Sequence, residues 1–97
     1  MIHELLGTGR ENARTARELA DIMNCGIRDI SRLAERERRE GHPICAATGE
    51  RPGYYLAADN EELEAYCSDL KNRAIELFKT RDALVKVLNA RQRRSAG

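Results

Sequence analysis

The stretch TARELADIMNCGIRDISRLAERERREG, residues 15–41, predicts two short helices joined by a tight turn. Thr15 followed three residues later by Glu18 is a capping-box pattern, so the first helix should begin there. The Asn-Cys-Gly sequence at residues 24–26 interrupts the helical spacing, because Asn and Gly tolerate the left-handed backbone that ends a helix. Gly and Pro within residues 41–43 should end the second helix. The apolar residues that recur at helical spacing, and should face inward, are Ala16, Leu19, Ala20, Met23, Ile27, Ile30, Leu33 and Ala34.

A β-hairpin is expected directly after this helix pair. Residues 43–48 predict a short strand, residues 49–53 are dense in turn formers, and residues 54–57 predict a second strand rich in β-favouring side chains. The tip of the hairpin carries Arg51 and is therefore basic. Tyr54 and its neighbour Tyr55 alternate across the second strand, so one should lie in the core and the other should be partly exposed.

The segment before Thr15 should support the helix pair. Ile2, Leu5 and Leu6 predict one apolar side of a short opening helix that ends near residues 7–9. We expect His3 to be an exposed polar residue on this helix, and residues 10–14 to form a polar connector.

Length and charge limit the possible functions. A chain of 97 residues with a net charge of +1 is one small domain, with room for one appended element. The charges are unevenly distributed: residues 57–70 carry five acids and no base, whereas residues 71–94 carry eight bases against Glu76 and Asp82. We find no nucleophile with a nearby base, no phosphate-binding loop and no carboxylate pair, so no enzyme activity is predicted.

The three cysteines, Cys25, Cys45 and Cys67, lie far apart and lack the paired spacing of a zinc site. We interpret them as small apolar residues in a reducing cytoplasm. The sequence has no apolar run of membrane-spanning length, and residues 1–9 lack the features of a signal peptide. We therefore expect a cytoplasmic protein without a metal, cofactor, small-molecule ligand or membrane partner.

Helix, turn, helix and hairpin is the element order of a winged helix, whose second helix enters the DNA major groove. The sequences TARELA (15–20), GIRDISRL (26–33), REGHPI (39–44) and GYYL (53–56) resemble the winged helix-turn-helix domains at the N-terminus of biotin-operon repressors and DeoR-like regulators. With its trailing charged helix, the chain is similar to small prophage-encoded proteins. The resemblance covers residues 2–57 and implies a mostly α fold with a small β-hairpin (α+β). Nothing resembling a biotin ligase or sugar-sensing domain follows, so those activities are not implied.

The sequence departs from the family pattern at two positions. Gly26 stands where the family usually has a serine cap, so the second helix should begin with a weaker cap. Glu37 stands at a usually apolar, core-facing position. We expect either that an arginine pairs with Glu37 or that the helix turns slightly there.

The resemblance also places candidate DNA contacts on the exposed face of the second helix, residues 27–36. They are Arg28, Asp29, Ser31, Arg32 and Arg36. An arginine guanidinium can donate to guanine O6 and N7 at once, and Ser31 could bind a phosphate. Asp29 would accept a hydrogen bond from cytosine or orient Arg32. The alternative is a solvated helix with ordinary surface pairs among Asp29, Arg32, Glu35, Arg36 and Arg39.

Phosphate contacts are expected outside this helix as well. Arg51 at the hairpin tip, with Thr48 beside it, should reach the DNA backbone. Arg14 and Thr15 would meet phosphate at the N-terminus of the first helix. For Tyr54 and Tyr55, base stacking is the less favoured role.

A long helix is predicted for residues 58–92, with a frayed basic tail at residues 93–97. Its apolar stripe repeats at alternating spacings of four and three and comprises Leu63, Cys67, Leu70, Ala74, Leu77, Arg81, Leu84 and Leu88, widened by Tyr66, Ile75, Phe78 and Val85. A helix of about 30 residues is about 45 Å long, which a winged domain cannot cover. We therefore predict a homodimer through Leu63, Leu70, Leu77, Phe78, Arg81, Leu84 and Leu88, the alternative being a helix folded back on its own domain as a hairpin. The helix is acidic near its start and basic near its end, so antiparallel pairing would place opposite charges side by side.

The sequence thus predicts a winged domain at residues 1–57 followed by this long helix. The expected function is sequence-specific duplex DNA binding, as a small transcription regulator or a phage or prophage accessory protein in DNA transactions. The alternative is a non-enzymatic adaptor that binds proteins through the winged helix and the long helix, since winged helices also bind proteins.

Overall fold

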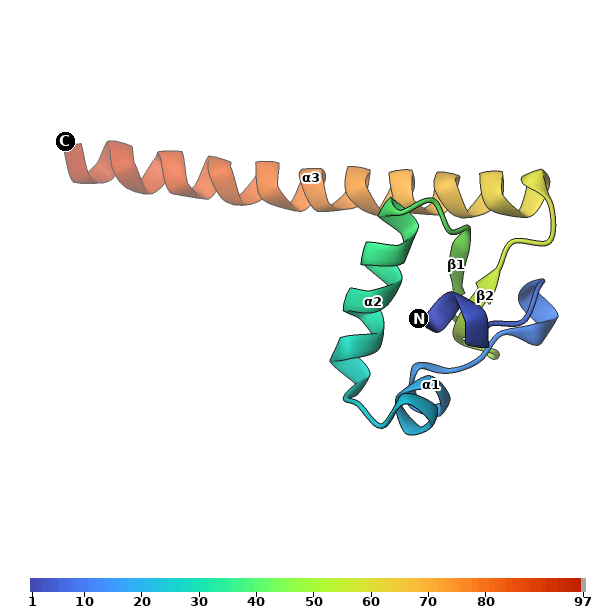
Figure 1. Cartoon of the computed structure of the whole chain (residues 1–97). Helices are drawn as coiled ribbons and strands as arrows, with labels where there is room; N and C mark the ends of the chain where they lie inside the picture. Colours follow the sequence, from blue (N-terminus) through green and yellow to red (C-terminus); the bar gives the residue numbers. More distant parts are fainter. Residues whose placement is uncertain (97) are drawn as a thin grey trace. The chain divides into compact units, whose positions relative to one another are not determined.

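The computed structural model describes residues 1–96. The elements, in chain order, are two short 3₁₀ helices, η1 (Ile2–Leu5) and η2 (Arg10–Asn12), then α1 (Ala16–Met23), α2 (Ile27–Arg39), β1 (Ile44–Ala47), β2 (Gly53–Leu56) and α3 (Asn60–Ala96) (Figure 1). Residues 1–66 form one compact unit, and the rest of α3 forms a second. The fold is mostly α with a small β-hairpin and a long C-terminal helix, as the sequence predicts.

The turn between α1 and α2 is built by local capping. The Glu18 amide donates to Thr15 Oγ1 at 3.1 Å, which caps α1, and Asn24 ends α1 in the left-handed conformation at φ 53°. Gly26 precedes α2, and its amide donates to Asp29 Oδ2 at 3.0 Å. Asp29 thereby stabilises the start of α2, where Gly26 has no side chain to do so.

The hairpin is extended by the N-terminal segment. β1 pairs antiparallel with β2, in a register that joins Ile44 to Leu56 and Ala47 to Gly53. Arg14 pairs with Tyr54 on the other edge of β2, since each backbone amide donates to the other residue's carbonyl, at 2.9 and 2.8 Å. The expected polar connector at residues 10–14 is therefore more than a connector, because it includes η2 and covers a strand edge.

Two clusters of buried side chains form the core of residues 1–66. The first comprises Ile2, Leu6, Leu19, Ala20, Ile30, Ala34 and Ile44, and joins η1, α1, α2 and β1. The second comprises Cys45, Ala47, Tyr55 and Tyr66, with Leu63 packed against it. Tyr55 is buried and Tyr54 is half-buried, as the alternation predicts. The prediction that Ile27 faces inward is wrong: it begins α2 and is 50% exposed.

Gly53 is the glycine that the fold requires most clearly. Its φ is +150°, and a Cβ at this position would lie 2.6 Å from the Arg14 carbonyl oxygen, which belongs to the backbone. Gly53→Ala should therefore lower the free energy of unfolding by about 1–3 kcal/mol, measured by urea denaturation. Gly49→Ala is the matched control, because Gly49 also has a positive φ but nothing lies within 4 Å of its Cβ position. An equal loss in both variants would contradict the close approach at Gly53.

α3 begins with a reciprocal cap and continues further than the sequence predicts. The Glu62 amide donates to Asp59 Oδ1 at 2.9 Å, and the Ala58 amide donates to Glu62 Oε1 at 3.1 Å. The helix runs unbroken from Asn60 to Ala96, so residues 93–96 are part of it. The compact unit, residues 1–66, includes the first turns of α3.

Candidate nucleic-acid interface

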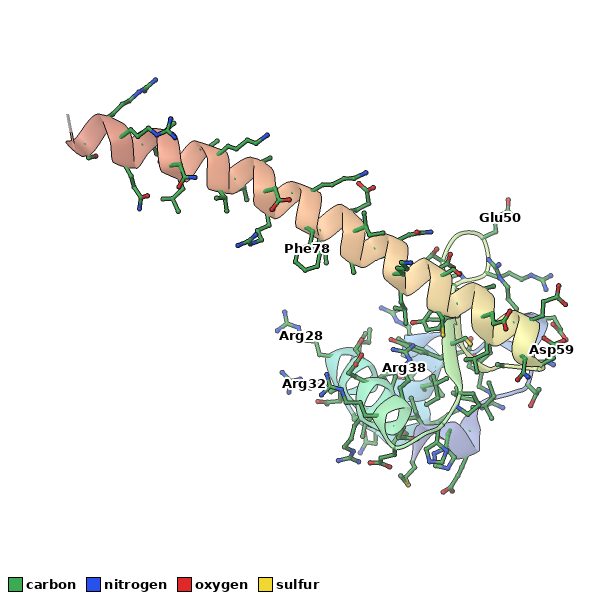
Figure 2. All side chains as sticks on the ribbon, turned by 90° about the horizontal axis from the view of Figure 1, so that it is seen from above. Arg28, Arg32, Arg38, Glu50, Asp59 and Phe78 are labelled. Carbon is green, nitrogen blue, oxygen red and sulfur yellow. The ribbon has the colours of Figure 1, made fainter. Side chains whose placement is uncertain are left out.

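Arg28 and Arg32 lie together on the outward face of α2. Ile30, Ala34 and Glu37 recur at helical spacing and are buried, which turns the opposite face of the helix to solvent. Figure 2 shows the two arginines extending outward from α2, away from the other elements of the compact unit. Both are exposed, and neither forms a hydrogen bond or ion pair with a residue of the described chain. Their guanidinium groups are therefore available to a partner.

In the C-terminal half of α2 the exposed arginines are paired with glutamates. Arg36 Nε lies 3.7 Å from Glu40 Oε1, and Arg39 Nε lies 3.5 Å from Glu35 Oε1. Both are exposed ion pairs within one helix. Each contributes less than about 1 kcal/mol to the stability of the fold. They match the alternative interpretation of ordinary surface pairs. Within residues 1–96, Arg28 and Arg32 of the predicted arginine row are thus unpaired, whereas Arg36 is paired.

Ser31 and Asp29 have contacts within the protein. The Ser31 and Tyr54 hydroxyl oxygens lie 3.2 Å apart, which connects α2 to β2. Asp29 Oδ2 accepts from the Gly26 amide, as described above. Both side chains remain exposed, but each has a role in positioning α2 that the sequence did not reveal.

A hollow of about 410 Å³ lies between the start of α1 and the hairpin. It is lined by Thr15, Ala16, Arg17, Ala46, Ala47, Thr48, Pro52, Gly53 and Tyr54. The structure thus brings together the predicted residues Thr15 and Thr48. Arg14 and Arg51 are exposed but do not line this hollow.

Sequence reasoning missed two basic residues near this hollow. Arg17 lines it from the first turn of α1, and Arg10 Nη2 donates to the Thr48 carbonyl at 3.5 Å. The position of Arg17 just after the Thr15 cap was a usable signal. No signal in the sequence indicated the contact between Arg10 and Thr48, because this contact depends on how the N-terminal segment pairs with β2.

Glu37 is fully buried, and its partners are not arginines. The Ile2 amide donates to Oε2 at 3.0 Å and the His3 amide donates to Oε1 at 2.9 Å, while His3 Nδ1 also contacts Oε1. The expected arginine pair is therefore wrong. His3 is not an exposed polar residue either, because its half-buried ring stacks on His42 with centroids 3.6 Å apart.

The hydrogen bonds to Glu37 also determine its charge. Burial raises the pKa of Glu37, but the hydrogen bonds from the His3 backbone and ring and from the Ile2 backbone outweigh burial, and the net pKa is below its ordinary value. The carboxylate therefore stays ionised and holds η1 against α2. This fixes the inner side of the helix that presents Arg28 and Arg32.

Arg38 connects three elements of the compact unit. Its Nε donates to the Ile44 carbonyl at 2.7 Å, and its guanidinium carbon lies 5.1 Å from the Tyr66 ring centroid and 6.0 Å from that of Tyr54. The cation thus contacts aromatic rings from β2 and from the start of α3. In Figure 2 it lies within the body of the domain, unlike Arg28 and Arg32.

Comparisons with family models, curated proteins and solved structures give no match to this chain. The family resemblance therefore depends on the residues quoted above. Among the helices described for residues 1–96, none is both long and apolar enough to span a bilayer.

Proposed function

We propose that this protein binds duplex DNA sequence-specifically, with α2 in the major groove. The observation that supports this best is that Arg28 and Arg32 are exposed and have no partner among residues 1–96. Both lie near the start of a helix that follows a tight turn. Arginine can donate to guanine O6 and N7 at once, and residues near the N-terminus of a recognition helix are those that reach base edges.

The basic residues around the hairpin would contact phosphate. Arg51 lies in the turn between β1 and β2, and Arg17 lines the hollow beside Thr48. Contacts of this kind set the position of a protein on the duplex, whereas base contacts specify the sequence. The role would be that of a small transcription regulator or a phage or prophage accessory protein acting in the cytoplasm.

Two single variants separate these contributions. Arg32→Ala should weaken binding to the preferred duplex by about 1–3 kcal/mol and relax the preference at one base pair. Arg51→Ala should weaken binding to all duplexes about equally and reduce the slope of log affinity against log salt by about 1. Selection from a random duplex pool, followed by fluorescence anisotropy at several salt concentrations, measures both effects.

A protein-binding adaptor is the second candidate, supported by two exposed isoleucines. Ile22 and Ile27, on either side of the turn between α1 and α2, are 52% and 50% exposed. Exposed isoleucines can pack against an apolar surface of another protein. Ile27 could equally contact a thymine methyl group. Absence of duplex binding by the wild type at low salt would favour the adaptor.

A further inference from the structure

The part of α3 beyond residue 66 exposes a stripe of apolar residues that is interrupted by Arg81. We call it the α3 seam; it comprises Leu70, Ala74, Leu77, Arg81, Leu84 and Leu88. Leu77 is 71% exposed and Leu84 is 64% exposed, and the neighbouring Phe78 is 63% exposed. The alternating spacing of four and three residues keeps the seam on one side of the helix for more than two heptads.

The surface around Leu77 has the form of a coiled-coil hole. One shallow depression is lined by Ala74, Leu77, Phe78 and Arg81, four residues at positions i, i+3, i+4 and i+7. A second depression on the other side of Leu77 is lined by Asn72, Arg73, Glu76, Leu77 and Thr80. Four residues at this spacing form the hole that accepts a side chain from a facing helix.

We propose that a second copy of this chain covers the α3 seam, as an antiparallel helix pair. Most helical stability in proteins comes from packing an amphipathic face rather than from intrinsic helix propensity. Pairing would remove these leucines from water, which favours association. The inference goes beyond DNA binding and does not depend on it.

Arg81 determines the orientation. In a parallel pair each seam residue faces its own counterpart, so two Arg81 guanidinium groups would meet in the seam without an acid on the adjacent seam positions. In an antiparallel pair Arg81 lies opposite Leu77 of the second copy, and its aliphatic stem can cover that leucine while the charged end reaches water. The antiparallel pair also places the acidic first turns of α3 beside the basic last turns of the second copy.

The register that covers every leucine of the seam is centred on Lys79. Leu70 then lies opposite Leu88 of the second copy, Ala74 opposite its Leu84, and Leu77 opposite its Arg81. By the same register, Cys67 lies opposite Arg91 of the second copy. The two Cys67 residues are then 24 residues apart along the axis, or about 36 Å at 1.5 Å per residue.

A distance between spin labels on Cys67 tests the orientation. Cys25→Ser removes the half-buried thiol, and Cys45 is fully buried, so that exposed Cys67 is the labelling site. We expect light scattering to show a dimer and the two Cys67 labels of that dimer to lie about 36 Å apart. Labels within about 10–15 Å of each other would mean a parallel pair and would overturn the proposal, as would a monomer at high protein concentration.

Two further variants test the register and the face. In the Cys25→Ser background, Arg91→Cys should give a disulfide-linked dimer on mild oxidation, whereas Cys67 alone should not. Leu77→Glu should raise the dimer dissociation constant about 100-fold or more, because both copies lose a buried leucine. Lys79→Glu, on the outward side of the same turn, should leave dimerisation unchanged. A dimer that survives Leu77→Glu, or one that Lys79→Glu disrupts, would contradict the proposed seam.

Discussion

Glu37→Ala should lower the free energy of unfolding of the compact unit by about 3 kcal/mol, because an unpaired buried donor costs about 1–3 kcal/mol and the variant leaves two amides without an acceptor. These are the amides of Ile2 and His3, which donate to the two carboxylate oxygens. Tyrosine fluorescence during urea denaturation measures the loss, since the chain has no tryptophan and its three tyrosines lie within residues 1–66.

Glu35→Ala is the matched control for this variant. Glu35 is on the same helix but is exposed, where its carboxylate pairs with Arg38 and Arg39 at 3.8 and 3.5 Å. Its removal should change stability by no more than about 0.5 kcal/mol. If Glu37→Ala were as mild as Glu35→Ala, the buried carboxylate would not be holding η1 on α2.

The same contacts predict how stability depends on pH. The pKa of Glu37 is lowered in the folded protein from an ordinary value of 4.5, so folding favours the ionised form. This contribution is present above about pH 4.5 and is lost as the pH falls through the lower, folded-state pKa. Glu37→Gln should therefore show a weaker loss of stability below that pH than the wild type does.

The double variant Arg28→Ala with Arg32→Ala should lower the affinity for the preferred duplex by about 2–6 kcal/mol, since each bidentate contact to guanine contributes about 1–3 kcal/mol. Binding would then approach the level seen with random duplex. The free energy of unfolding should stay within about 0.5 kcal/mol of the wild type, because both side chains are exposed and have no partner in the described chain. Fluorescence anisotropy with the selected duplex measures the affinity.

The paired arginines of the same helix provide the control. Arg36→Ala with Arg39→Ala removes the same charge from α2, but from side chains that contact Glu40 and Glu35. We expect a smaller loss of affinity, similar for all duplex sequences, as for the loss of charge alone. Equal losses in the two double variants would argue against base contacts by Arg28 and Arg32.

The sequence predicted the features that depend on local interactions. Capping and turn preferences act between residues that are close together in the chain. They predict the Thr15 cap, the left-handed conformation of Asn24 and the β-hairpin after the helix pair. The exposed positions of Arg28 and Arg32 follow from helical spacing alone. These local signals were enough to predict the fold class.

The features that the sequence did not reveal depend on distant contacts. Glu37 is separated from His3 by 34 positions, and spacing within α2 could not identify its partner. Ile27 fits the apolar period but occupies the first turn of α2, where the core does not reach it. The pairing of Arg14 with Tyr54 could not be predicted from local sequence, because it requires the N-terminal segment to fold along β2.

The most direct test of the DNA-binding proposal is an NMR titration of the ¹⁵N-labelled protein with its selected duplex. We expect the largest shift changes in α2 from Ile27 to Arg36, including the Nε–H signals of Arg28 and Arg32, with smaller changes around Arg51. The proposal would be contradicted if these signals stayed unchanged while the duplex bound elsewhere, or if no duplex bound at low salt.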